Sequence, residues 1–261
     1  MKLKNIFQIL EKEYPLAISI EFANQLGIHD NSGMLINFDD EIKQILFALD
    51  LTDAVVENAI KNNINCIITH HPVIFKPIKS LSAIGENSTL LKAIVNRINI
   101  ISMHLNADAA PKGIDYYLAN ALGLKKLKTV QHTILDRCQY RHIFEISKKN
   151  LDCILKECIL EFKTEKIWLF GDKNKEITTV ASFCGAGIDQ SAIQLIRENN
   201  VELVVSSDIK HNFLVDLVGR NIAVLQMTHY ANENYGFYKI YEDIMKKLAC
   251  TCHYFLEKNL L

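Results

Sequence analysis

Two adjacent histidines, His70 and His71, follow the apolar run from Cys66 to Ile68. Neutral imidazoles and carboxylates are the usual protein ligands of zinc, iron, manganese and nickel. Successive side chains of an extended chain point in opposite directions, so the two imidazoles cannot easily chelate one ion. Each could hold one of two neighbouring ions, and the pair therefore predicts a two-metal site. The alternative is a polar pair that only ends a strand.

A second polar segment runs from His104 to Asp108. The carboxylate of Asp108 offers two oxygens that can bridge a pair of cations. His104 is a candidate for proton transfer or for orienting a ligand, and Asn106 for orienting water or substrate. If this segment only starts a helix, Asp108 or Asp115 would be its cap, an interpretation that suits Asp115 better.

A third segment contains His229 and Glu233, which lie four residues apart. If a helix begins near residue 230, both side chains face the same spot and can bind the same ion. The alternative is that Glu233 only complements the positive end of the helix dipole.

Two weaker candidates accompany these segments. Lys76 and Lys79 follow the histidine pair and could bind an anionic substrate, although lysines in loops are commonly only solvated. Gly185 and Gly187 could let backbone amides approach an anion, but two glycines at this spacing more often form a tight turn.

The composition of the 261-residue chain excludes several classes of function. Lys plus Arg number 29 and Asp plus Glu number 30, so the net charge does not indicate a nucleic-acid partner or an anionic membrane surface. No apolar stretch reaches the length of a membrane span, and we expect a cytoplasmic protein. The seven cysteines form no C-x-x-C pair, which favours reduced thiols.

Short apolar runs alternate with helical patterns along the chain. The predicted strands are Ile45 to Leu49, Asn65 to Thr69, Ile98 to Met103, Thr179 to Cys184, Glu202 to Ser206 and Ala223 to Met227. The predicted helices between them are Asp53 to Lys61, Ser88 to Arg97, Ile114 to Leu122, Gln190 to Asn199 and Ile209 to Val218. Strands that alternate with helices pair in parallel, so the predicted fold class is α/β.

The two halves of the chain repeat one order of elements, which predicts an internal duplication with two similar α/β lobes and a cleft between them. We expect a first lobe over residues 1–127 and a second over 128–261, with the C-terminal helix packing back on the first. Between the halves, His132 to Ser147 is expected to form a long strand and Leu151 to Phe162 an amphipathic helix.

Polar residues follow six of the predicted strands. They are Asp50, the pair His70 and His71, His104, the glycines Gly185 and Gly187, Asp208 and His229. In open parallel sheets, ligands bind beyond the carboxyl ends of the strands. The candidate ligands therefore occupy the positions where such a fold places its site.

Three of these segments together resemble a known family. They are Thr69 to Pro77, His104 to Asp108 and His229 to Glu233, and further similarity covers Asp30 to Leu35 and Gly113 to Leu124. The chain resembles the NIF-three-like family, whose bacterial members are often called GTP cyclohydrolase I type 2 homologues. Longer members carry an inserted middle domain, which this chain is too short to contain.

The resemblance implies a two-lobed α/β fold, a dinuclear centre of two divalent ions in the cleft, and a ring-shaped homohexamer. Its metal ligands would be His70, His71, Asp108, His229 and Glu233. The chain departs from the common pattern elsewhere, with His29 for a Trp, Asn37 for a Gly, Ser207 for a Gly and Asn232 for a Ser or Thr. None of these departures removes a ligand, but they weaken any transfer of substrate.

We therefore expect a dinuclear metal-dependent hydrolase that uses a metal-bridging water and two divalent ions per chain, which can be Zn, Fe, Mn or Ni. GTP as the substrate rests on the family label alone, and a phosphoesterase or an amide-type hydrolase acting on a small molecule would need the same residues. The alternative is a non-enzymatic metal carrier, sensor or regulatory protein. A closed coordination sphere would favour that alternative, and an open one would favour hydrolysis.

Overall fold

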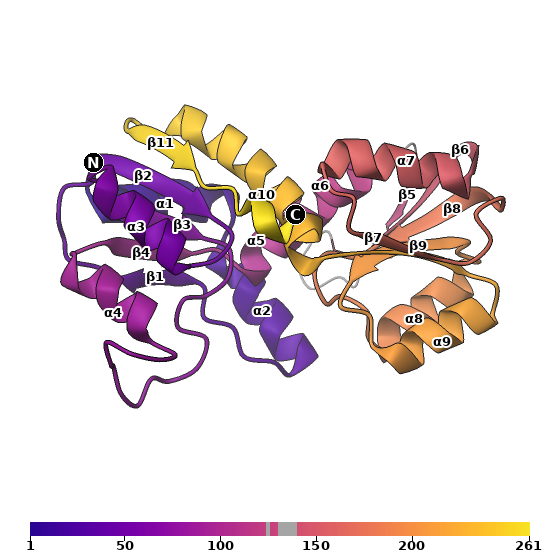
Figure 1. The fold of residues 1–261 in the computed structure, drawn as a ribbon, viewed down its shortest axis with the longest axis horizontal. Coiled ribbons are helices and arrows are strands. Elements are labelled where there is room, and N and C mark those ends of the chain that lie inside the picture. The colour runs from indigo at the N-terminus through magenta and orange to yellow at the C-terminus, as the bar shows by residue number, and fades with distance from the viewer. Residues whose placement is uncertain (124–125, 130–139) are drawn as a thin grey trace. The chain divides into compact units, whose positions relative to one another are not determined.

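The computed structural model describes residues 1–123, 126–129 and 140–261, and Figure 1 draws them as a ribbon. The chain divides into two compact units. The first contains Met1–Ala110 and Phe237–Leu256, and the second contains Pro111–Gly236 and Glu257–Leu261. This division differs from the expected boundary between residues 127 and 128, which falls inside the second unit, because the first unit ends at Ala110 and regains the later half of the C-terminal helix.

The first unit is built on a five-stranded mixed sheet. Its strands, in spatial order, are β1 (Gly33–Ile36), β4 (Asn99–Ser102), β3 (Cys66–Thr69), β2 (Gln44–Ala48) and β11 (Thr251–Tyr254). The strands β4, β3, β2 and β11 are parallel, and β1 pairs with β4 in the antiparallel direction. The central strands β3 and β4 are buried at every position, as expected for parallel strands covered on both faces.

Helices cover this sheet. They are α1 (Leu3–Glu13), α2 (Leu16–Leu26), α3 (Asp53–Lys61), α4 (Ser88–Val95), the short α5 (Leu105–Ala109) and the later half of α10 (His229–Ile244). The side chain of Thr52 caps α3 by accepting a hydrogen bond from the backbone N–H of Val55. The helix α2 ends at Gly27, whose φ of 63° lies in the left-handed region that glycine adopts without strain.

The second unit is built on a six-stranded mixed sheet. Its strands, in spatial order, are β5 (Lys126–Thr129), β6 (His142–Asn150), β8 (Glu176–Ser182), β9 (Leu203–Ser207), β10 (Ala223–Met227) and β7 (Ile167–Phe170). The strands β8, β9 and β10 are parallel, and the other three pair in the antiparallel direction. The helices of this unit are α6 (Ile114–Ala121), α7 (Leu151–Phe162), α8 (Gln190–Glu198), α9 (His211–Gly219) and the first half of α10. Two short 3₁₀ helices, η1 (Met245–Lys247) and η2 (Lys258–Leu260), complete the described elements.

The α/β fold class is confirmed, and all six predicted strands occur within a few residues of their predicted bounds. The sheets are mixed rather than purely parallel, because edge strands that the pattern did not reveal add in the antiparallel direction. Part of the predicted strand from His132 to Ser147 lies outside the described residues, and β6 begins at His142. Among the described helices, none is both long enough and apolar enough to cross a membrane.

Candidate metal centre

The carboxyl ends of β2, β3 and β4 lie at one edge of the first sheet, because the three strands are parallel. Asp50, the histidine pair and His104 follow these strands directly. The backbone N–H groups of His70 and His71 both donate to the carbonyl oxygen of Leu49, at 3.1 and 3.0 Å. The sheet therefore extends its hydrogen bonding into the histidine pair and fixes the backbone from which both rings project.

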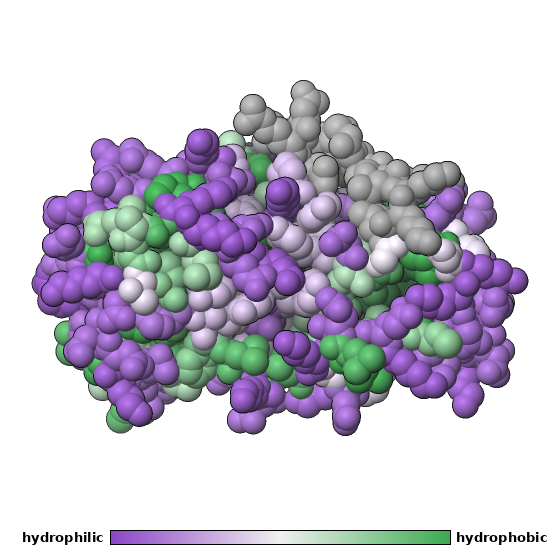
Figure 2. Space-filling model, turned by 90° about the horizontal axis from the view of Figure 1, so that it is seen from above, coloured by the Kyte–Doolittle hydropathy of each residue, from purple (hydrophilic) through white to green (hydrophobic). Residues whose placement is uncertain are grey.

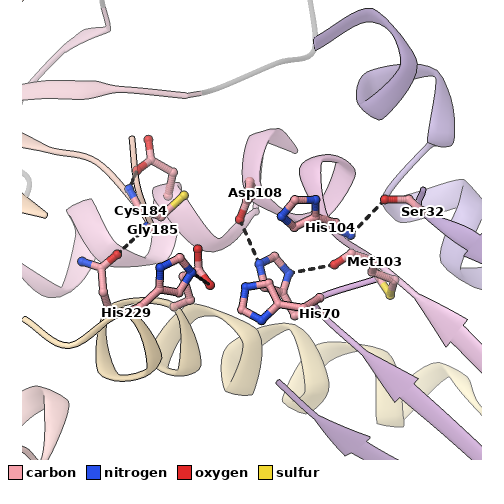
Figure 3. Close-up of polar contacts among 12 residues, drawn as sticks. Ser32, His70, Met103, His104, Asp108, Cys184, Gly185 and His229 are labelled. Carbon is pink, nitrogen blue, oxygen red and sulfur yellow. Dashed lines mark hydrogen bonds and ion pairs between the residues drawn. The ribbon is translucent and has the colours of Figure 1, made fainter. Parts of the chain in front are cut away.

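His70 is fully buried, and its Nδ1 lies 2.8 Å from the carbonyl oxygen of Met103 (Figure 3). A carbonyl oxygen can only accept a hydrogen bond, so the Nδ1 atom carries a proton, and in the neutral ring it is the Nε2 atom that can bind a metal. That Nε2 lies 3.5 Å from Oδ1 of the buried Asp108 on α5. A lone pair and a carboxylate oxygen facing each other at this distance suit a shared cation.

Carboxylates hold two further histidines of the first unit. Nδ1 of His71 lies 2.7 Å from Oδ1 of Asp50, and Nδ1 of His104 lies 2.5 Å from Oδ1 of Asp30. A carboxylate on one ring nitrogen fixes the ring and makes the other nitrogen a better ligand. Nitrogen atoms of His70, His71 and His104 lie within 4.8 Å of one another, a spacing at which they could hold a metal ion.

Asp30 is the most strongly hydrogen-bonded carboxylate of this group. Burial raises its pKa, but hydrogen bonds from His104, Ser19 and Ser32 hold the pKa well below the usual range of an aspartate. Ser32 donates both its backbone N–H, at 3.1 Å, and its hydroxyl, at 2.7 Å, to Oδ2. The Ser32 hydroxyl also accepts a hydrogen bond from the backbone N–H of His104 (Figure 3). The loop before β1 therefore positions His104 at both its backbone and its ring.

The second unit carries its own histidine and carboxylate pair at the start of α10. Nε2 of His229 lies 2.9 Å from Oε2 of Glu233, the contact expected for residues four apart on a helix. Nδ1 of His229 lies 2.5 Å from Oδ2 of Asp208, which follows β9. The prediction that His229 and Glu233 face one spot is confirmed, and His229 is oriented by a carboxylate in the same way as His71 and His104.

The turn after β8 supports Glu233. Gly185 has a φ of 54°, and a Cβ atom at this position would overlap the carboxylate of Glu233. The N–H of Gly185 donates to Oδ1 of Asn232 at 2.7 Å, and its carbonyl oxygen accepts from the hydroxyl of Ser207 at 2.8 Å. Gly185 therefore forms the tight turn that the sequence favoured, and the turn also provides the surface on which Glu233 rests.

We expect Gly185→Ala to weaken metal binding by the second unit without unfolding it. The methyl group is incompatible with the observed position of Glu233 and strains the left-handed backbone, so the carboxylate has to move. Metal titration followed by calorimetry should show a weaker affinity, while circular dichroism stays unchanged. Gly219→Ala is the control, because a Cβ at Gly219 meets nothing within 4 Å. Equal metal affinities of the two variants would contradict the supporting role of Gly185.

Asp115 is not the helix cap that its position suggested. Its buried carboxylate accepts hydrogen bonds from the backbone N–H of Arg141 at 2.5 Å, from Nδ1 of His142 at 2.9 Å and from the backbone N–H of Cys184 at 2.8 Å. It therefore ties the start of β6 to the turn that contains Gly185. The sequence does not reveal this role, because all three donors are distant from Asp115 along the chain.

The three candidate substrate-binding residues have different surroundings. Asn106 is buried and donates its amide N–H to the carbonyl oxygen of Tyr14 at 2.8 Å, so its donor group stabilises the fold. Lys76 is exposed, and Lys79 lines a mostly apolar cavity together with Leu81. Substrate binding by Asn106, Lys76 and Lys79 stays a prediction.

The three carboxylates that orient histidines were not selected from the sequence as functional residues. They are Asp30, Asp50 and Asp208. Asp50 and Asp208 did stand out as polar residues at strand ends, and Asp30 belongs to a segment that carries the family resemblance. The useful signal would have been the acidic residues just after β2 and β9, Asp50 and Asp208, because each can orient an imidazole.

The sequence profile of the family described as Duf34/NIF3 (NGG1p interacting factor 3) matches residues 1–258 of the chain. A protein of Clostridium acetobutylicum named GTP cyclohydrolase 1 type 2 homolog is 29% identical over 241 residues, which are 89% of this chain and 85% of that protein. A protein of the same name from Staphylococcus epidermidis is 39% identical over 131 residues, but the match spans half of this chain and only 34% of the longer relative.

Solved structures share the fold. The Staphylococcus aureus hypothetical protein SA1388 superposes with a TM-score of 0.82 at 23% identity, covering 98% of this chain and 96% of that one. A Bacillus cereus protein related to NIF3 gives a TM-score of 0.81 at 18% identity, with the same coverage. Reduced HcgD from Methanocaldococcus jannaschii gives 0.79 at 25% identity and covers 97% of both chains.

Proposed function

The chain belongs to the Duf34/NIF3 family, and we propose that it is a metal-dependent hydrolase with two divalent cations per chain. One observation carries the proposal. His70, His71, His104 and His229 each have Nδ1 held by a carbonyl or carboxylate oxygen. Such partners fix the tautomer and direct Nε2 outward as a ligand. Four histidines held in this way support a metal-binding role.

We propose that three residues of the first unit and two of the second are the protein ligands of these cations. His70, His71 and Asp108 come from the first unit, and His229 and Glu233 come from the second. This mixed nitrogen and oxygen donor set suits zinc, iron, manganese or nickel. Asp108 is the proposed shared ligand, because one of its oxygens faces His70 and a carboxylate can bind two cations at once.

Two bound cations would lower the pKa of water toward neutrality and neutralise negative charge that develops on the attacked group. His104 is the candidate for moving a proton, because Asp30 holds its Nδ1 and leaves Nε2 for the substrate or for water. A ring nitrogen of His104 also lies within 4.8 Å of ring nitrogens of His70 and His71. His104 is therefore also a candidate for an additional metal ligand.

The substrate is proposed to be a small molecule with a hydrolysable bond. The name of the relatives favours a ring opening of the kind that a GTP cyclohydrolase performs. The residues fit the hydrolysis of a phosphoester or an amide equally well, because all three reactions need an activated water and a stabilised anion. Any activity of the longer relatives, of which this chain matches only a part, is likewise only proposed for this chain.

An unbiased metabolite screen tests the proposed function. The metal-loaded protein is incubated with a metabolite extract, and His71→Ala serves as the blank because it removes a proposed ligand. We expect at least one metabolite to be consumed by the wild type and not by the variant. The low exposure of His70, Asp108 and Glu233, at 0%, 5% and 3%, supports the second candidate function, a metal carrier or sensor with an enclosed ion. Unchanged metabolites together with slowly exchanging metal would favour that second candidate.

We further propose that the chain assembles into a homohexamer and arose by internal duplication. Both sheets contain three consecutive parallel strands, which supports the duplication. Apolar side chains are exposed among hydrophilic ones on the face drawn in Figure 2. Independently of that view, the exposed large apolar side chains of the described residues include Ile84, Val95 and Leu160. Large apolar residues at this level of exposure favour an interface. Light scattering should report a particle larger than a dimer, and a monomer at micromolar concentration would refute the assembly.

A further inference from the structure

A cavity of about 250 Å³ lies in the first unit between α2 and the loop of residues 28–32. Its apolar wall consists of Leu16, Ile20, Ala23 and Ile28. Ile20 is 62% exposed and Ile28 is 47% exposed, so two large apolar side chains border the cavity in contact with water. Covering such a surface with an apolar group removes it from water and lowers the free energy.

The polar wall of the cavity offers few charged groups to a ligand. No lysine or arginine is among the residues that line it. Asp30 is the one acidic residue, and its carboxylate already accepts hydrogen bonds from Ser19, Ser32 and His104. A phosphate or carboxylate group would find no cation here, and a cation would compete with existing hydrogen bonds. The lining therefore favours an uncharged occupant.

Two amide side chains provide hydrogen bonding at the edge of the cavity. Asn31 donates its amide N–H to the carbonyl oxygen of Ile74 at 2.6 Å, which directs the amide and leaves its carbonyl oxygen as an acceptor. Asn24 is exposed on α2 and offers both a donor and an acceptor. The edge of a nitrogen heterocycle presents complementary N–H and ring-nitrogen groups.

Aromatic rings connect this cavity with the candidate metal centre. Phe75 is 46% exposed and lies edge-on to the ring of His29, with centroids 6.1 Å apart, and to the ring of His104, at 6.4 Å. His29 lines the cavity, and Asp30 both lines it and holds Nδ1 of His104. Flat ligands stack on exposed aromatic faces, histidine included.

We propose that this cavity binds a flat, uncharged nitrogen heterocycle. The volume is slightly below the range of about 300–1,000 Å³ that holds drug-sized ligands, so it fits one bicyclic ring of purine size rather than a whole nucleotide. The apolar wall covers one face of the ring, and the amides of Asn24 and Asn31 bind its edge. Binding of the ring does not depend on the proposed hydrolase function. The further step, that the ring belongs to the substrate, rests on that function.

Binding of adenosine to the full chain tests this inference. Saturation-transfer NMR is recorded on protein stripped of metal with a chelator and on metal-loaded protein, with ribose 5-phosphate as the comparison ligand. We expect adenosine to bind both forms and ribose 5-phosphate to bind the stripped form much more weakly. Adenosine that binds only the loaded protein would overturn the assignment, because the metal would then be its ligand.

A matched pair of variants locates the binding. Ile20→Glu places a charge in the apolar wall, and Ile60→Glu makes the same change at an exposed position of α3. Both sites are exposed, so both variants should fold, and their melting temperatures check this. Loss of the apolar contact should lower the affinity for adenosine about tenfold in Ile20→Glu and leave it unchanged in Ile60→Glu. Equal affinities of the two variants would overturn the proposal.

The outcomes also separate this inference from the proposed function. Adenosine binding that depends on Ile20, combined with no hydrolysis in the metabolite screen, would support the cavity and count against the hydrolase. Hydrolysis by a protein that does not bind adenosine would support the hydrolase and overturn the cavity assignment.

Discussion

Asp108→Asn should abolish metal-dependent hydrolysis and release at least one of the two cations, while the fold stays intact. Asparagine preserves the shape of the side chain but lacks the negative charge that holds two cations together. The fold should persist because His70, which faces Asp108, keeps its hydrogen bond to the carbonyl oxygen of Met103. Metal content per chain and circular dichroism are the two measurements.

Two further variants set the scale for Asp108→Asn. Asp50→Asn removes only the partner of His71, so it should weaken metal affinity roughly 10- to 100-fold, the usual effect of losing a residue that orients a ligand. Asp40→Asn changes an exposed ion pair with Arg97 and should leave the metal content unchanged. If Asp108→Asn kept both metals and full activity, its carboxylate would not be a shared ligand.

The largest effect on stability is expected for Asp115→Ala. The change leaves the backbone N–H groups of Arg141 and Cys184 and the ring of His142 without their acceptor in a fully buried place. Stranded buried donors and a broken buried pair cost about 3–5 kcal/mol. For a protein of this size, the melting temperature should fall by about 10 °C.

Asp152→Ala is the control for this experiment. Asp152 also lies in the first turn of a helix of the second unit, but its ion pair with Lys156 is exposed. Such a pair is screened by water and salt, so scanning calorimetry should find the melting temperature nearly unchanged. If the two variants melted at the same temperature, the hydrogen bonds of Asp115 would not stabilise the second unit.

Much of the fold could be predicted from the sequence, because burial on both faces leaves a clear pattern. The apolar strands β3 and β4 and the helix α3 were predicted at nearly their observed bounds. The missed edge strands β7 and β11 each have four residues, none of them buried. Such short segments show neither the two-residue period of a strand nor the 3.6-residue period of a helix clearly. The antiparallel edge strands β1 and β7 and the parallel edge strand β11 were therefore not predicted.

The candidate ligands were identified for a similar reason. Each follows a strand whose apolar run marks where the strand ends, so the position of the side chain follows from the position of the strand. The partners Asp30 and Asp208 could not be assigned, because their hydrogen bonds to His104 and His229 join residues 74 and 21 positions apart. Gly185 illustrates the same limit, since its contact with Glu233 depends on tertiary packing.

The metal content of the purified protein is the most direct test of a dinuclear centre. Protein prepared without chelator is repleted with zinc, manganese or iron, freed of loose metal, and measured by elemental analysis against protein concentration. The oriented histidines and the shared carboxylate of Asp108 predict two divalent ions per chain, and the count should fall in the Asp108→Asn variant. No bound metal after repletion with any of the three, or two ions retained by the variant, would contradict the proposed centre.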